Sequence, residues 1–134
     1  MAITDFHLLL LEGDPGRRES MLQAAREAGL ARVHALSDVA EARNFLDERI
    51  PSLLLFDLDA PSGLEILSVV KRRPELRRIV TVGLFDRRDG EALGAAYDLH
   101  INSCLVRPNG SEEQVGLFRS LRQYWEGMNQ TSGF

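Results

Sequence analysis

Hydrophobic residues are concentrated in five short runs along the chain. The central run, Leu53–Leu58, is apolar except for Asp57. Because it lacks polar alternation, it is typical of a strand covered on both faces, as in a parallel sheet packed between helices. A charge is costly inside such a strand, so we expect Asp57 at its carboxyl end, facing a crevice. In open α/β sheets, ligands bind at that edge.

The other four runs alternate with amphipathic segments, so strands and helices are predicted in turn. Further strands are expected over Phe6–Leu11, Arg32–Leu36, Ile79–Leu84 and Ile101–Val106. Such alternation implies one parallel sheet with right-handed crossovers and helices on both faces. Ser111–Gln114 has the form of a capping box and is predicted to open the last helix. The pattern leaves the strand order open.

Length, composition and charge limit the kinds of protein that this chain can be. The chain has 134 residues, of which 44% are hydrophobic, enough for the core of one domain. We expect that domain over residues 1–128 and a polar C-terminal tail over 129–134. A formal charge of -4 argues against a nucleic-acid-binding surface. No run is long enough for a membrane span, and no signal peptide opens the chain. With a single cysteine, Cys104, these features predict a cytoplasmic protein.

Three of the predicted strands end in polar residues: Glu12 and Asp14, then Asp57 and Asp59, then Arg107. Together these ends resemble the receiver domain of two-component response regulators, in order and over almost the whole chain. The motifs that carry the resemblance are Leu9–Pro15, Leu53–Asp59 and Tyr97–Pro108. The third motif and the Tyr124-Trp125 ending look most like the single-domain receivers that partner bacterial phytochromes. The resemblance implies an α/β, flavodoxin-like, doubly wound (βα)5 fold, with a five-stranded parallel sheet of order 2-1-3-4-5.

The same resemblance implies a site and its chemistry. In the family an aspartate attacks a phosphohistidine of a sensor histidine kinase, and Mg²⁺ neutralises the incoming charge. Asp57 matches the phosphoacceptor. Glu12, Asp57 and the backbone carbonyl of Asp59 match the Mg²⁺ ligands. A single-domain response regulator that takes phosphate on Asp57 and signals by protein contact is therefore the leading hypothesis, with a phytochrome-type kinase as partner.

Several matched positions depart from the family pattern. Gly13 replaces the second acid, although Asp14 is a candidate substitute through a water, and Arg107 replaces the lysine. Phe85 stands at the hydroxyl position and Cys104 at the aromatic switch position. As an aromatic residue, Phe85 is also interpretable as a core or lid residue. The Mg²⁺ site is thus expected to be weakened, and the usual hydroxyl–aromatic coupling is absent.

These departures keep a second hypothesis open, a degenerate receiver that works as a phosphate-independent interaction module. An enzyme is the least favoured class. The pair Asp57 and Asp59 also resembles the Asp-x-Asp motif of haloacid-dehalogenase-type phosphatases. That family needs a downstream lysine and a later acidic pair, but the chain's lysine, Lys71, lies on a predicted helix and Arg107 stands alone.

The final predicted helix carries more apolar residues than one packed face requires. They cover about half of its circumference, whereas a stripe of about 100° suffices to cover a sheet edge. We therefore expect a second, exposed apolar face that forms a homodimer. The residues assigned to this face are Leu117, Leu121, Tyr124 and Met128.

Overall fold

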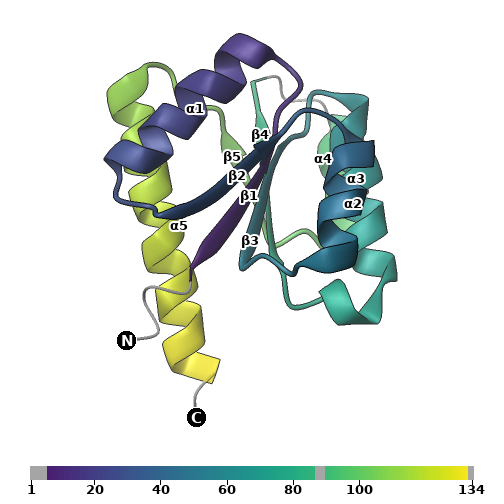
Figure 1. Ribbon diagram of the computed structural model, residues 1–134. Coiled ribbons are helices and arrows are strands. Elements are labelled where there is room, and N and C mark those ends of the chain that lie inside the picture. The colour runs from purple at the N-terminus through teal and green to yellow at the C-terminus, as the bar shows by residue number, and fades with distance from the viewer. Residues whose placement is uncertain (1–5, 87–89, 133–134) are drawn as a thin grey trace.

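The computed structural model describes residues 6–86 and 90–132, and Figure 1 shows a sheet between two layers of helices. The strands are β1 (His7–Leu11), β2 (Arg32–Leu36), β3 (Leu53–Asp57), β4 (Val80–Phe85) and β5 (Ser103–Val106). The helices are α1 (Pro15–Glu27), α2 (Val39–Glu48), α3 (Pro61–Arg72), the 3-10 turn η2 (Pro74–Leu76), α4 (Gly90–Asp98) and α5 (Ser111–Ser132). All strand pairs are parallel, in the order β2-β1-β3-β4-β5. The expected fold class is confirmed.

The alternation of side chains along the strands divides the core into two halves. Leu8 and Leu10 of β1 face α1 and α5, where Phe118 is fully buried. Leu9 and Leu11 face the opposite way, toward α2, α3 and α4. Figure 1 shows the same layers, with α1 and α5 on one side of the sheet and α2, α3 and α4 on the other. Because both faces are covered, β3 is buried on both sides, as its sequence predicted, and so is β1.

The starts of α3 and α5 are set by contacts with neighbouring elements. Helix α3 begins at Pro61, so the turn after Asp57 contains only three residues, 58–60. The capping box at the start of α5 does not form. The helix begins at Ser111, the carboxylate of Glu113 accepts from the backbone N–H of Asn109, and Gln114 accepts from the Ser20 hydroxyl of α1. Gln114 therefore ties α5 to α1, and a tertiary contact has replaced the predicted local one.

Helix α5 reaches Ser132, so it includes residues 129–132 of the segment expected as a tail. Its far end extends past the sheet in Figure 1. Among the described residues, no helix is long and apolar enough to cross a membrane.

Candidate functional site

One charged residue lies at the carboxyl end of each of four strands, so four charged residues share one edge of the sheet. Asp57 is the last residue of β3, and Glu12, Asp86 and Arg107 directly follow β1, β4 and β5. The strand register aligns these ends, since Leu11 pairs with Phe56, and Phe85 with Val106. The carboxyl edge expected from the sequence is therefore where the charged residues meet.

Arg107 is the centre of this group. Its guanidinium contacts three carboxylates: Nη2 lies 2.7 Å from Oδ1 of Asp57, Nη1 lies 3.3 Å from Oε1 of Glu12, and Nε lies 3.2 Å from Oδ2 of Asp86. The side chains of Arg107, Glu12 and Asp57 are only 8%, 3% and 11% exposed. Arginine suits this task because its planar fork carries several N–H donors in fixed directions. We refer to these four residues as the Arg107 cage.

Glu12 is held from the α1 side as well. Its Oε2 accepts from the backbone N–H of Asp14, and its backbone carbonyl accepts from Nη1 of Arg18 at 2.9 Å. Nε of Arg17 lies 3.3 Å from Oε1 but makes no hydrogen bond, so this contact is electrostatic only. Asp14, the candidate substitute acid, instead caps α1 by accepting from the backbone N–H of Arg17 at 2.7 Å. Its carboxylate is therefore used to start the helix.

A chain of hydrogen bonds links the ends of β3 and β4. The backbone N–H of Asp59 donates to Oδ1 of Asp57 at 2.8 Å. The carboxylate of Asp59 in turn accepts from the backbone N–H of Asp86 at 2.7 Å. Sequence reasoning missed Asp86 as a site residue. The available signal was an acid near the end of an apolar run, since Asp86 stands two residues beyond the predicted strand Ile79–Leu84.

The short turn after Asp57 depends on two glycines. A Cβ on Gly63 would lie 2.2 Å from the carbonyl oxygen of Asp57, so α3 approaches β3 too closely for any side chain there. Leu58, the first residue of the turn, is 3% exposed and lies over Gly83 of β4, where a Cβ would be 2.5 Å from its side chain. Leu58 also donates its backbone N–H to the carbonyl of Leu84. The turn is thus anchored on both neighbouring elements.

The two expected switch positions lie outside the Arg107 cage. Phe85 is half-buried and packs against the core half covered by α2, α3 and α4, which supports its interpretation as a packing residue. Cys104 packs against the same half of the core and contacts the hydroxyl of Tyr97. Burial raises the pKa of the Cys104 thiol above its ordinary value. Neither residue offers a hydroxyl to the cage.

The expected Mg²⁺ ligands are arranged differently from a metal site. In the part of the chain that the structure describes, no group of three His, Cys, Asp or Glu side chains is placed to hold a metal ion. A cation bound by Glu12 and Asp57 would have to displace a guanidinium that already pairs with both. The ligand expected from Asp59 is its backbone carbonyl, and its side chain accepts from the Asp86 backbone N–H. As arranged, these residues do not fit a divalent cation.

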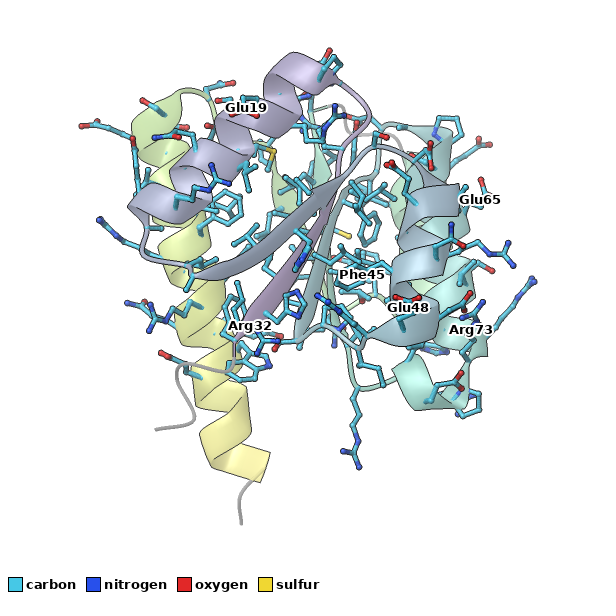
Figure 2. The ribbon with its side chains drawn as sticks, viewed as in Figure 1. Glu19, Arg32, Phe45, Glu48, Glu65 and Arg73 are labelled. Atoms are coloured by element: carbon cyan, nitrogen blue, oxygen red, sulfur yellow. The ribbon has the colours of Figure 1, made fainter. Side chains whose placement is uncertain are left out.

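A second polar cluster lies near the amino end of β1. Nε2 of His7 and Nδ1 of His34 are 2.8 Å apart, so one ring donates a hydrogen bond to the other. Both rings pack on Phe45, which projects from α2 toward the sheet (Figure 2). Burial, followed by the charges of His34, Arg32 and Arg49, lowers the pKa of His7 from 6.5 to about 4. The neutral form of His7 is therefore part of the folded state.

This shift predicts acid sensitivity. The pKa of His7 is lower in the folded than in the unfolded chain, so its contribution to stability is complete above pH 6.5 and is lost as the pH falls toward about 4. We expect the free energy of unfolding to drop by on the order of 2 kcal/mol over this interval because of His7. Urea unfolding of wild type and His7→Gln at several pH values measures this contribution as the difference between the two curves.

His100→Asn, at an exposed position, should follow the wild type. Parallel curves for wild type and His7→Gln would contradict the prediction.

Comparison with known proteins places the chain in a family. It matches no protein-family model. It is 30% identical over 137 residues to the probable methanogenesis regulatory protein FilR2 of Methanothrix harundinacea, covering 96% of this chain and 88% of that protein. Among solved structures, a response regulator receiver domain from Rhodospirillum rubrum superposes with a TM-score of 0.74 at 28% identity, covering 90% of this chain and 93% of the other.

Phytochrome-associated response regulators are also among the structural matches. The bacteriophytochrome response regulator AtBRR gives a TM-score of 0.66 at 29% identity over 83% of this chain and 92% of that one. The Mn²⁺-bound form of the response regulator Rcp1 gives a TM-score of 0.72 at 24% identity over 90% and 94%. The Rcp1 structure contains a bound Mn²⁺ ion. The chain belongs to the receiver domains of the response regulators of two-component signalling, which are signalling modules rather than enzymes.

Proposed function

We propose that this receiver accepts a phosphoryl group on Asp57 from a sensor histidine kinase and passes the signal on by protein contact. The observation that carries the proposal is the position of Asp57 at the carboxyl end of the central strand β3, with a guanidinium 2.7 Å from its carboxylate. A carboxylate is a competent nucleophile for phosphoryl transfer when the charge of the incoming group is neutralised. The likeness to bacteriophytochrome response regulators supports a phytochrome-type kinase as the donor.

The chemistry follows from the contacts of Asp57 and Arg107. A carboxylate oxygen of Asp57 forms the new P–O bond while the P–N bond to the donor histidine breaks. The bonding electron pair leaves with the imidazole ring, which takes up a proton from solvent. Nη2 of Arg107 is close enough to Asp57 to move from the carboxylate to a phosphoryl oxygen, because arginine pairs well with phosphate.

Intact mass after incubation with acetyl phosphate tests the proposal. The wild type should gain the mass of one phosphoryl group, and Asp57→Asn should gain none because it lacks the nucleophilic oxygen. Asp59→Asn is the matched control, since it changes a nearby acid whose carboxylate is directed to the Asp86 amide. It should still be modified. A wild type that gains no mass with acetyl phosphate or with any histidine kinase would refute phosphorylation of Asp57.

A phosphate-independent interaction module is the second candidate function, and the Arg107 cage favours it. Oδ1 of Asp57 already interacts with Arg107 and accepts from the backbone N–H of Asp59, and Arg107 already contacts three carboxylates. The hydroxyl position is Phe85, which packs against the core. If phosphorylation fails, partner binding should be the same in wild type and Asp57→Asn.

The surface for protein contact is proposed at the β5 edge of the sheet. Among the described residues, three of the four exposed large hydrophobic side chains come from α4, β5 and α5: Tyr97 is 58%, Val106 64% and Tyr124 42% exposed. The face expected from the sequence is partly corrected here. Leu121 is 4% exposed and belongs to the core, and Leu117 is half-buried against it. The Met128 side chain lies outside the described residues.

We expect a homodimer through this α4–β5–α5 face, because exposed apolar patches usually mark binding sites. Light scattering should give about twice the chain mass of 15.0 kDa, and Val106→Glu with Tyr124→Glu should return the mass to that of one chain. Ile50→Glu is the matched control, since Ile50 is 55% exposed but lies outside α4, β5 and α5. It should remain dimeric. A monomeric wild type at micromolar concentration would rule out the dimer and leave the face for another protein.

A further inference from the structure

We infer that Arg107 is the resident cation of this site and that it excludes divalent metal ions from Glu12 and Asp57. The inference concerns metal binding, so it goes beyond phosphorylation and holds whether or not Asp57 accepts a phosphoryl group. It rests on the Arg107 cage, in which one buried guanidinium bridges carboxylates from β1, β3 and β4.

The first argument is that the oxygens a metal would use are already engaged. Oδ1 of Asp57 has Arg107 at 2.7 Å and the Asp59 amide at 2.8 Å. Oε1 of Glu12 has Arg107 and Arg17 at 3.3 Å each, and Oε2 accepts from the Asp14 amide. Mg²⁺ demands near-ideal octahedral geometry at about 2.0–2.1 Å, so it tolerates no arginine nitrogen between its ligands.

Charge gives the second argument. A metal ion entering between Glu12 and Asp57 would meet the permanent positive charge of Arg107, which is not lost at any pH of interest. Arg107 is 8% exposed, so water screens this repulsion poorly. The guanidinium is also held by Asp86, which opposes its withdrawal toward solvent.

The third argument concerns Gly13, where a second acid is expected in the family. A Cβ on Gly13 would meet only the Ser37 carbonyl at 3.6 Å, an ordinary contact, and Gly13 itself is exposed. An aspartate therefore fits at this position without strain. Because Arg107 already supplies positive charge to the two buried acids, the chain has no need of a third carboxylate for a metal. The missing acid at Gly13 and the replacement of the family's lysine by Arg107 therefore have one explanation.

Metal titration tests the inference without any phosphorylation step. Binding of Mn²⁺ is followed by loss of the electron paramagnetic resonance signal of the free ion, and binding of Mg²⁺ by the rise in melting temperature that a ligand of the folded state produces. The proteins compared are wild type, Arg107→Gln, Gly13→Asp and the double variant Gly13→Asp/Arg107→Gln. Glutamine is chosen because its amide keeps a donor near the carboxylates while removing the charge.

Wild type and Gly13→Asp should bind neither ion at millimolar concentration, because Arg107 is present in both. Arg107→Gln should bind at least about tenfold more tightly than wild type, and the double variant more tightly still. Addition of Asp57→Asn should abolish the gained binding, which locates the ion. Arg17→Gln is the matched control, since Arg17 contacts Glu12 but not Asp57, and it should behave as wild type.

Several results would overturn the inference. Wild type that binds Mn²⁺ at millimolar concentration, with binding lost in Asp57→Asn, would show that Arg107 does not exclude metal. If Gly13→Asp binds metal as tightly as Arg107→Gln does, the low metal affinity of the wild type is due to the missing acid at position 13 and not to Arg107. A folded Arg107→Gln protein without metal binding would also contradict it. If Arg107→Gln does not fold, the wild-type and Gly13→Asp titrations still decide, because both must stay free of metal.

Discussion

Replacing Arg107 with methionine is expected to lower the free energy of unfolding by about 3–5 kcal/mol, the usual cost of removing one partner of a buried ion pair. Methionine keeps much of the side-chain volume but leaves the carboxylates of Glu12 and Asp57 buried without their cation. Glu12 is 3% exposed, so water cannot replace the lost contact. Urea unfolding monitored by circular dichroism measures the change.

Arg73→Met is the matched control for Arg107→Met. Arg73, the residue that follows α3, also lies 2.7 Å from a carboxylate, that of Asp47, but this pair is 28% and 57% exposed, and Figure 2 shows Arg73 directed away from the sheet. A surface pair of this kind contributes about 0.2–1 kcal/mol. Adding Asp57→Asn to Arg107→Met should recover part of the loss, because one of the unpaired charges is removed. Equal effects of Arg107→Met and Arg73→Met would show that burial does not strengthen the Arg107 cage.

Gly63→Ala should be similarly damaging, with an expected loss of about 3 kcal/mol or more, the upper end of overpacking effects. The added methyl group would lie 2.2 Å from the carbonyl oxygen of Asp57, and the nearby atoms are mainly backbone, which cannot rotate away. Relief requires α3 to move from β3, which displaces Asp57 itself. Unfolding measurements give the loss of stability, and intact mass after acetyl phosphate gives the effect on Asp57.

Gly116→Ala tests whether the damage at Gly63 comes from the contact or from glycine replacement in general. Gly116 lies inside α5, and a Cβ there would have nothing within 4 Å. Alanine in a helix interior is better than glycine by about 0.5–1 kcal/mol, so this variant should be more stable than wild type. If Gly63→Ala is also neutral or stabilising, the close approach of α3 to β3 does not constrain the sequence.

Much of the fold was readable from the alternation of apolar runs and amphipathic segments. The absence of polar alternation marked β3 as buried on both faces, because a strand covered by helices on both sides has no polar face. The strand order came from the resemblance, since the pattern does not say which strands are neighbours. The last helix begins at Ser111 as predicted, but its capping box does not form, because Gln114 is placed by a contact with Ser20 of α1, and the helix continues to Ser132.

The site was predictable in position but not in contacts. Asp57 and Glu12 were identified because acids directly after apolar runs are expected at the carboxyl edge of the sheet. The pairing of Glu12 with Arg107 spans 95 positions of the sequence, and nothing in local spacing indicates it. Asp86 was missed because no family motif marks that position. Leu121 was assigned to the exposed face of α5 because helical periodicity gives angles between residues but not which angle faces the sheet.

The packing of Leu58 over Gly83 has a consequence for how this sequence can diverge. The two positions share one space, since a Cβ on Gly83 would lie 2.5 Å from the Leu58 side chain. A larger residue at position 83 is tolerable only together with a smaller one at position 58, and residues in such contact are expected to covary. A longer turn after the position of Asp57 would remove this pairing, because its first residue need not lie on β4. Covariation between these two positions should therefore be confined to relatives with the short turn.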